Sequence, residues 1–315
     1  MIHLPRARRS GPSRGEGTLK ELFDAYKAHK RADGRRSIDE IERIFDHDIL
    51  PELGRRKPEE ISTHEVSKLL DKIAVRSPSV AWAVRRQLSA FYSWAIPRLP
   101  HGATNPVTNA SRPPKVKARD RVLSDDELKL LWNIVENERE PWRTAVKLLI
   151  LTGQRREEVL SADWKEFDLQ KKVWTVPAGR AKNGKAHLVP LSPAVVALLK
   201  QLPKRTGRLF PKGTGIVSRA AKRIRDAMGD VPPWTWHDLR RTVATGLQRL
   251  DVRLEVTEAI LNHVSGSRAG IVGVYQRHDW AEEKREALHK WAAHVARLVN
   301  AKPVRKSRGP SRRGG

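Results

Sequence analysis

The stretch Trp236-His237-Asp238-Leu239-Arg240-Arg241 decides how this chain is interpreted. Leu261-Asn262-His263 and then Tyr275 follow it, and Thr152-Gly153-Gln154-Arg155 precedes it. Each fragment is common alone, but their order and spacing are not. Two arginines, two histidines and one tyrosine are the groups needed to break and rejoin a phosphodiester bond without a metal ion.

The chemistry of phosphoryl transfer explains why these residue types matter. It needs a nucleophile, donors for the charge that grows on the non-bridging oxygens, and an acid for the departing oxygen. Arginine suits the second task because its guanidinium group meets two phosphate oxygens at once and stays charged. His237 and Arg240 share a face at the start of a helix, where the positive end of the helix favours an anion.

The composition indicates a polyanion as the partner. The chain has 315 residues, of which 62 are Lys or Arg and 36 are Asp or Glu, so its formal net charge is +26. Residues 1–17 carry +3 and residues 301–315 carry +6, which leaves +17 on the body between them. We expect double-stranded DNA rather than a membrane surface, because no basic amphipathic helix stands apart from the core-forming helices.

Several classes of protein are excluded by what the sequence lacks. There is no cysteine, which excludes a disulfide scaffold, a thiolate metal site and a cysteine nucleophile. The N-terminal residues lack the apolar stretch of a signal peptide, and the longest apolar run is too short to span a bilayer. We expect no metal ion, no cofactor, and a soluble cytoplasmic protein associated with the nucleoid.

Changes in periodicity and composition divide the chain into two folded blocks. Residues 18–110 are expected to form a helical domain, residues 111–120 a proline-rich basic linker, and residues 121–300 a mixed α+β domain. Residues 1–17 and 301–315 are expected to be disordered basic tails. The predicted fold class is mainly α and multidomain: a helical bundle, then an α+β domain with a small antiparallel sheet.

Capping signals and hydrophobic periodicity predict the individual elements. Four helix starts carry a capping box, in which a glutamate follows a serine or threonine by three residues: Thr18…Glu21, Ser37…Glu40, Ser62…Glu65 and Ser124…Glu127. Pro51 and Gly54 are expected to separate the second helix from the third. Further helices are predicted near 79–96, 124–137, 141–152, 192–200, 215–228, 237–249, 254–262 and 279–299. Residues 172–176 and 187–191 are expected to be strands around the turn signal Asn183-Gly184.

The ordered constellation resembles the tyrosine recombinase family, the phage and prophage integrases. The matching fragments are Thr152-Gly153-x-Arg155-x-x-Glu158, a lysine on the hairpin, His237-x-x-Arg240, Leu261-Asn262-His263 and Tyr275. The resemblance covers residues 120–299 closely, and the helical block before them resembles that family's core-DNA-binding domain more loosely. The prophage-type subgroup usually also carries an N-terminal arm-binding domain, which this chain is expected to lack.

The resemblance implies a role for each matched residue. Four of them would bind the scissile phosphate: Arg155, His237, Arg240 and His263. Tyr275 would attack that phosphate and form a 3′-phosphotyrosyl link, which conserves the bond energy and needs no ATP. Lys182 would protonate the 5′ oxygen, and Glu158 would orient Arg155 through a charge-assisted hydrogen bond.

Some assignments remain open at the level of sequence. Arg156 competes with its neighbour Arg155, and Lys185 competes with Lys182 on the same hairpin. The remaining histidines that we considered are interpreted as structural: His101, His187, His278, His289 and His294. Trp236 either buttresses the site or belongs to the core, and the helix over residues 281–299 docks on its own domain or on a neighbouring subunit.

The function implied is that of a site-specific DNA recombinase that integrates or excises mobile DNA. It would act on attachment sites as a homotetramer in the synapse, be a monomer when free, and accept an accessory DNA-bending protein. Basic residues of the first domain are candidate phosphate contacts: Lys27, Lys30, Arg31, Arg35, Arg36, Arg85 and Arg86. The alternatives are strand relaxation like that of a type IB topoisomerase, or a decayed integrase that only binds DNA.

Overall fold

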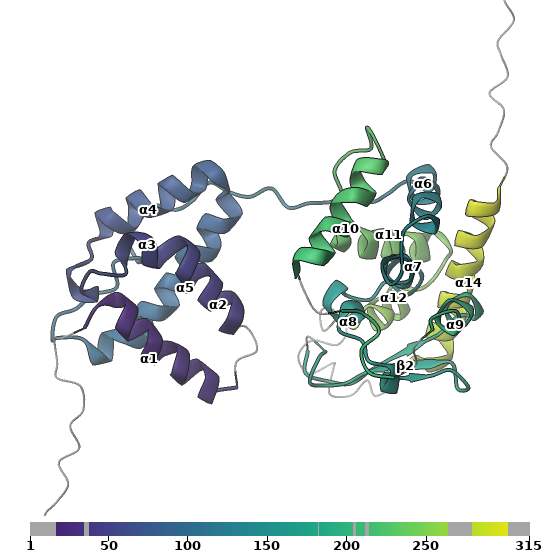
Figure 1. Cartoon of the computed structure of the whole chain (residues 1–315), viewed down its shortest axis with the longest axis horizontal. Helices are drawn as coiled ribbons and strands as arrows, with labels where there is room; N and C mark the ends of the chain where they lie inside the picture. Colours follow the sequence, from purple (N-terminus) through teal and green to yellow (C-terminus); the bar gives the residue numbers. More distant parts are fainter. Residues whose placement is uncertain are drawn as a thin grey trace, which may run out of the picture. The chain divides into compact units, whose positions relative to one another are not determined.

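The structure is a computed structural model that describes residues 17–34, 38–181, 183–203, 206–211, 214–263 and 279–301. The chain divides into two compact units, Met1–Ala118 and Arg119–Gly315 (Figure 1). The first is helical, and the second combines helices with one three-stranded sheet. The predicted fold class is therefore confirmed. Within the described ranges, no helix is both long and apolar enough to cross a membrane.

The first unit packs its helices around an aromatic core. Its elements are α1 (Leu19–Ala32), α2 (Ile38–Ile44), a π-helical turn (Phe45–Ile49), α3 (Leu50–Leu53), a 3-10 turn (Pro58–Glu60), α4 (Thr63–Arg76), α5 (Pro78–Ala95) and a second 3-10 turn (Ile96–Arg98). Phe23 of α1 stacks on Phe45, with ring centroids 3.8 Å apart, and Phe91 of α5 meets both rings edge-on. These rings are fully buried, so the apolar periodicity of three separate segments converges on one core.

The helix starts follow the capping signals where the structure describes them. Thr18, Ser62 and Ser124 each form both bonds of the predicted capping box with the glutamate three residues on. Ser37 lies outside the described residues. The expected break before the helix that starts at Thr63 is found at Gly54, the C-cap of α3, whereas Pro51 lies inside α3. The π-helical turn before it joins α2 to α3, and Pro51 stands in the first turn of α3, where its missing N–H is tolerated.

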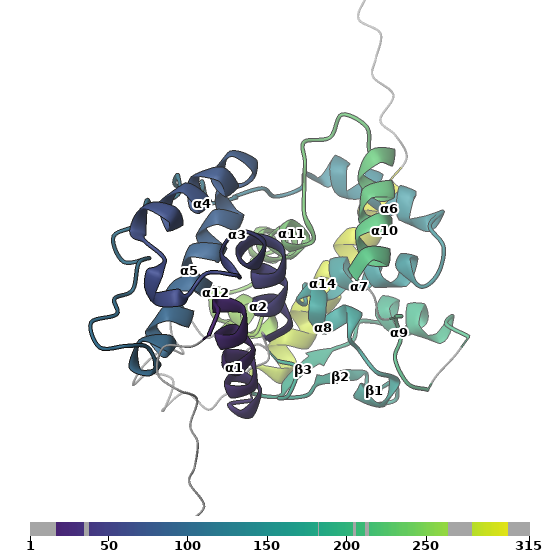
Figure 2. The same ribbon diagram turned by 60° about the vertical axis from the view of Figure 1, so that its left-hand side comes forward.

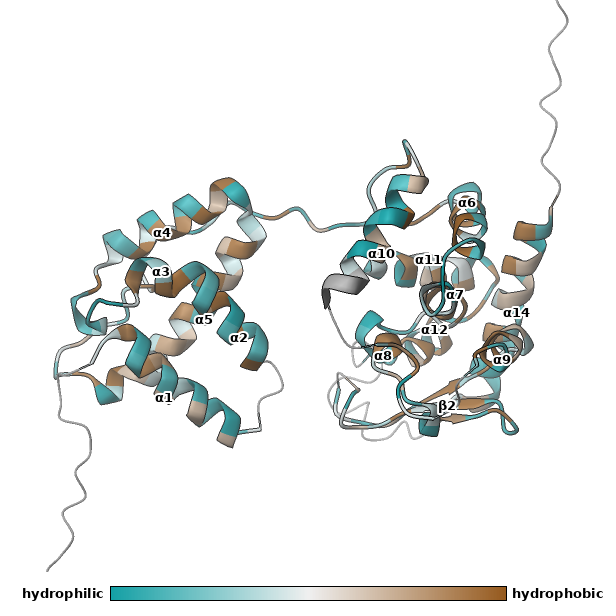
Figure 3. Ribbon diagram, in the orientation of Figure 1, coloured by the Kyte–Doolittle hydropathy of each residue, from teal (hydrophilic) through white to brown (hydrophobic). Residues whose placement is uncertain are grey.

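The second unit surrounds one central helix. Its helices are α6 (Asp125–Glu136), α7 (Trp142–Thr152), α8 (Arg156–Leu160), α9 (Pro193–Lys200), α10 (Thr214–Ala227), α11 (Trp236–Arg249), α12 (Leu254–Ile260) and α14 (Ala281–Asn300), with a 3-10 turn at Trp164–Glu166. Nearly every residue of α7 is buried. Figure 3 shows the contrast with α10, whose visible side is largely hydrophilic. A helix that is apolar all round belongs at the centre of a core.

The small sheet lies at the lower edge of the second unit in Figure 2 and has the strand order β1-β2-β3, all antiparallel. The strands are β1 (Phe167–Asp168), β2 (Val173–Val176) and β3 (His187–Pro190). β2 and β3 are the predicted hairpin, paired so that Trp174 lies opposite Val189. β1 was not predicted, because two residues are too few to show a period. Its Phe167 stacks on Trp174 with ring centroids 5.2 Å apart.

The C-terminal helix α14 packs on its own unit in this single chain. Trp291 is buried and its indole N–H donates to the carbonyl oxygen of Ile150 in α7, at 2.7 Å. Gly246 of α11 makes room for the ring, because a Cβ there would lie 2.2 Å from Trp291 Cζ3. The apolar side of α14 is thus covered by α7 and α11 of the same chain.

Candidate active site

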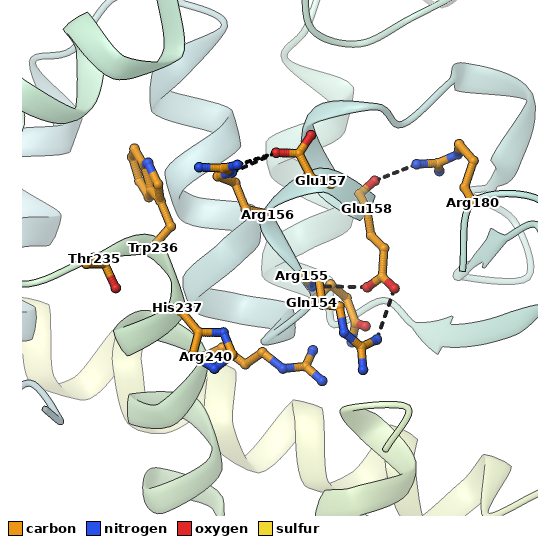
Figure 4. Close-up of a pocket in the computed structure, with 10 residues that line it drawn as sticks. All are labelled: Gln154, Arg155, Arg156, Glu157, Glu158, Arg180, Thr235, Trp236, His237 and Arg240. Atoms are coloured by element: carbon orange, nitrogen blue, oxygen red, sulfur yellow. Dashed lines mark hydrogen bonds and ion pairs between the residues drawn. The ribbon is translucent and has the colours of Figure 1, made fainter. Parts of the chain in front are cut away.

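A cleft of about 470 Å³ in the second unit collects most of the described residues that the sequence marked for catalysis. Figure 4 shows the Arg240 side chain reaching from α11 toward Arg155 at the start of α8. The residues that line the cleft are Gln154, Arg155, Arg156, Glu157, Glu158, Arg180, Thr235, Trp236, His237 and Arg240. Three segments that are far apart in the sequence, at residues 154–158, 180 and 235–240, therefore line the same cleft.

The turn between α7 and α8 depends on Gly153. Its φ is +63°, a left-handed conformation that ends α7, and its N–H donates to Leu149 O at 3.0 Å. A Cβ on Gly153 would lie 3.0 Å from Val243 Cγ1 and 3.3 Å from Leu261 Cδ2, so packing also requires glycine. The Thr152-Gly153 motif therefore turns the chain sharply after α7 and places Arg155 at the cleft.

Arg155 is held from two sides. Its Nη1 donates to Glu158 Oε1 at 3.0 Å, and its backbone N–H donates to Glu158 Oε2 at 3.1 Å. Its Nη2 donates to the carbonyl oxygen of Asn262 at 3.1 Å. Glu158 is buried, so this ion pair is well protected from solvent. The contact expected between Glu158 and Arg155 is present. Arg156, the competing arginine, also lines the cleft but pairs with the exposed Glu157 at 2.8 Å.

Arg240 is the most buried of the predicted phosphate ligands, at 4% exposed. Its Nη1 donates to Gly153 O at 2.8 Å, and its Nη2 donates to the carbonyl oxygen of Leu261. Burial, followed by the charge of Arg155, lowers the pKa of Arg240 to about 9. The guanidinium group is still charged at neutral pH, so the cleft holds two fixed positive charges, and the charges of Glu158 and Glu258 act to raise the pKa of Arg240.

His237 occupies the first turn of α11. Asp238 caps that helix by accepting from the backbone N–H of Thr235 at 2.7 Å and from its hydroxyl at 2.8 Å. Partial burial, and then the charges of Arg241 and Arg240, lower the pKa of His237. The ring is therefore neutral in the free protein at physiological pH, and an anion bound in the cleft would favour its protonation.

The hairpin and the end of α12 meet beside Arg155 through two asparagines. Asn183 Nδ2 donates to Asn262 Oδ1 at 2.6 Å, and Asn183 Oδ1 accepts the backbone N–H of Lys185 at 3.1 Å. Because Asn262 O also accepts from Arg155, the pair links the hairpin tip to Arg155. In the sequence, Asn183 is recognisable only as a turn residue, and its contact with Asn262 has no local signal.

Comparison with known proteins identifies the family. Residues 121–280, about half of the chain, match the phage integrase family. The chain belongs to the phage integrase family. The resemblance recognised in the sequence is thus confirmed at the level of the family.

The individual relatives of this chain share about a quarter of its residues. The prophage integrase IntA of Escherichia coli (strain K12) is 27% identical over 272 residues, which cover 81% of this chain and 64% of IntA. The prophage integrase IntZ of the same organism is 26% identical, over 84% of this chain and 68% of IntZ. The chain therefore spans about two thirds of the length of these relatives.

Solved structures share the fold of this chain. A lambda integrase dimer bound to a COC′ core site aligns with a TM-score of 0.64 and 23% identity, over 79% of this chain and 96% of that one. A lambda integrase tetramer bound to a Holliday junction aligns with a TM-score of 0.65 and 24% identity, over 79% of this chain and 78% of that one. At this identity the likeness concerns the fold alone.

Not every predicted site residue falls within the part of the chain that the structure describes. Lys182, Tyr275, Arg35 and Arg36 lie outside it. His263 is described and follows the cap of α12, although it is not among the residues that line the cleft. His187 is buried between β3 and α12, where its Nε2 lies 3.0 Å from Ile260 O.

The basic residues predicted to contact DNA in the first unit differ in their surroundings. Lys27 pairs with Asp24 at 2.9 Å and with Glu42 at 3.1 Å, and Arg31 also pairs with Glu42. The remaining described candidates have other environments: Lys30 Nζ lies 5.1 Å from the Tyr26 ring centroid, Arg85 donates to the carbonyl oxygens of Val107 and Thr108, and Arg86 is exposed. Phosphate contacts by Lys27, Arg31 or Arg85 would thus compete with existing partners.

Proposed function

We propose that this integrase is a site-specific DNA recombinase that cleaves and rejoins strands through a 3′-phosphotyrosyl intermediate. The observation that carries the proposal is the convergence of Arg155, His237 and Arg240 on one cleft within a member of the phage integrase family. Two guanidinium groups and an imidazole are the donors that a phosphodiester needs as negative charge grows on its non-bridging oxygens.

Tyr275 is the nucleophile in this proposal. The chain has three tyrosines, and the other two, Tyr26 and Tyr92, are buried in the core of the first unit. The Tyr92 hydroxyl donates to Pro58 O at 3.0 Å, and burial raises its pKa well above the ordinary value. A buried phenol that is hydrogen-bonded to the backbone is a poor nucleophile, which leaves Tyr275 for the attack.

The reaction then proceeds in two balanced steps. The Tyr275 hydroxyl gives its proton to the neutral ring of His263, and its oxygen bonds to phosphorus as the bond to the 5′ oxygen breaks. A hairpin lysine, Lys182 or Lys185, gives the departing oxygen its proton. The 5′ hydroxyl of a partner strand later returns a proton to that lysine and attacks the phosphotyrosine, while His263 returns its proton to the phenol. Arg155 and Arg240 hold the non-bridging oxygens in both steps, with His237 and His263 as further donors.

The partner and the assembly follow from this chemistry. We propose double-stranded attachment-site DNA as the substrate, since the body of the chain carries a large positive charge. Lambda integrase, whose fold this integrase shares, was solved as a tetramer bound to a Holliday junction, and we propose the same assembly here. The integration or excision of mobile DNA is the proposed outcome, as the names of the prophage relatives suggest.

A nicked suicide substrate that carries candidate attachment-site DNA tests the proposal. We expect wild type to form an adduct that survives denaturation and Tyr275→Phe to form none, while Tyr92→Phe retains it. Arg155→Ala is expected to slow adduct formation by about 10²–10³-fold, the usual effect of losing one charge-stabilising donor. Arg156→Ala is the matched control and keeps a rate near that of wild type. Equal loss in both arginine variants would contradict the assignment of Arg155.

A further inference from the structure

The corner that ends α12 contains a contact that sequence reasoning did not predict. Asn262 has a φ of +49°, and its N–H donates to Ala259 O at 3.2 Å. The N–H of His263 donates to Glu258 O at 3.0 Å. This is a Schellman cap, in which a left-handed residue turns the chain back over the last helical turn. The turn brings the His263 side chain back to the Glu258 side chain.

The two side chains meet through one ring nitrogen. His263 Nδ1 lies 3.0 Å from Glu258 Oε1. An ionised carboxylate can only accept, so a hydrogen bond here requires the proton on Nδ1. We propose that Glu258 is the positioning residue of His263: it fixes the ring and keeps the Nδ1 proton, which leaves Nε2 for the reacting groups.

The surroundings of the pair explain why a carboxylate is useful at this position. The groups that face this corner from the neighbouring elements are mainly bases: Arg155 at the start of α8, and Arg240 and His237 on α11. The buried acid Glu158 also lies here, paired with Arg155. The charge of Glu258 also acts to raise the pKa of Arg240. Both members of the pair remain partly exposed, His263 at 35% and Glu258 at 26%, so the ring can still reach a substrate.

The effect of Glu258 on catalysis rests on the function proposed above, whereas its effect on the tautomer of His263 does not. With its proton held on Nδ1, the neutral ring presents a lone pair at Nε2 and can take a proton. The charged ring presents N–H at Nε2 and can donate to a phosphate oxygen. Without Glu258 both nitrogens compete for the proton, and the ring loses its fixed orientation.

Nuclear magnetic resonance tests the tautomer directly in the full chain without DNA. Two-bond ¹H–¹⁵N correlation spectra of protein labelled with ¹⁵N-histidine distinguish the two neutral tautomers, and His263→Asn assigns the signal. In the neutral form of the ring, observed at alkaline pH, we expect His263 to be protonated at Nδ1. A wild-type ring protonated mainly at Nε2 would overturn the proposal, whatever any variant does.

Two variants of α12 distinguish the effect of the Glu258–His263 contact from the effect of removing any negative charge from that helix. Glu258→Ala is expected to lose the Nδ1 tautomer, whereas Glu255→Ala removes an exposed acid of α12 and is expected to keep it. On a suicide substrate, Glu258→Ala is expected to cleave at least about tenfold more slowly, which is within the range for losing an orienting partner. An unchanged tautomer in Glu258→Ala would also refute the assignment.

The two proposals fail in different ways. If wild type forms the covalent adduct but His263 is protonated at Nε2, the recombinase chemistry stands and the role of Glu258 falls. If the ring has the expected tautomer and no adduct forms on authentic attachment-site DNA, the contact stands and the proposed function falls.

Discussion

His187 is expected to make the second unit sensitive to mild acid. Burial, followed by the charge of Lys284, lowers the pKa of His187 from 6.5 to about 3. Its Nε2 lies 3.0 Å from Ile260 O, so the ring joins β3 to the end of α12 that carries His263. Protonation of this ring would place a charge in the core and would disturb the corner beside the cleft.

The size of the effect follows from proton linkage. In the folded protein the ring stays neutral down to about pH 3, while the unfolded chain takes up a proton near pH 6.5. Because the folded-state pKa is depressed, this contribution to stability is complete well above pH 6.5 and is lost as pH falls from there toward 3. Each unit below 6.5 costs about 1.4 kcal/mol, so falling from about pH 7.5 to about pH 5 costs about 2 kcal/mol.

The assay compares unfolding at these two pH values. His187→Gln removes the titrating ring and keeps an N–H donor for Ile260 O. Urea unfolding followed by tryptophan fluorescence reports mainly the second unit, which holds eight of the ten tryptophans. We expect wild type to lose about 2 kcal/mol more than His187→Gln between about pH 7.5 and about pH 5. The exposed control His101→Gln is expected to behave as wild type, and equal losses in wild type and His187→Gln would refute the reasoning.

Three further predictions concern packing, backbone conformation and the hairpin lysine. Gly246→Ala places a Cβ 2.2 Å from a tryptophan ring of α14, and we expect calorimetry to show a loss of about 1–3 kcal/mol. Gly153→Ala and Gly229→Ala each force a non-glycine residue into a positive φ, which costs about 1–2 kcal/mol. Only at Gly153 would the added Cβ also meet close neighbours. We therefore expect urea unfolding to show a larger loss of stability for Gly153→Ala, and only this variant to cleave DNA more slowly. In a 5′-bridging phosphorothiolate substrate, sulfur replaces the departing 5′ oxygen and leaves without needing a proton. This substrate is expected to restore cleavage to the variant that has lost the general acid, either Lys182→Ala or Lys185→Ala. Rescue of neither would exclude a hairpin lysine.

Features set by neighbouring residues were predictable from the sequence. The capping boxes at Thr18, Ser62 and Ser124 are local hydrogen bonds, and they form where the pattern places them. The hairpin of β2 and β3 follows from β-prone segments around a turn signal. The cleft could be anticipated because His237 and Arg240 are fixed relative to each other by one helix.

Features that depend on distant contacts were not predictable. Asn183 and Asn262 are far apart in the sequence, and neither hydrophobic periodicity nor motif spacing predicts their hydrogen bond. The capping geometry that brings Glu258 to His263 requires Asn262 to be left-handed, for which asparagine is only a weak signal. Pro51 itself does not end a helix, because it stands in the first turn of α3, where its missing N–H is tolerated.

The central claim is that Tyr275 attacks a phosphate held by Arg155 and Arg240. The most direct test isolates the covalent protein–DNA adduct, digests it with nuclease and protease, and locates the nucleotide on the peptide by mass spectrometry. The account predicts a 3′-phosphotyrosyl nucleotide on Tyr275 and on no other residue. A nucleotide on a different side chain, or an adduct that still forms with Tyr275→Phe, would contradict it.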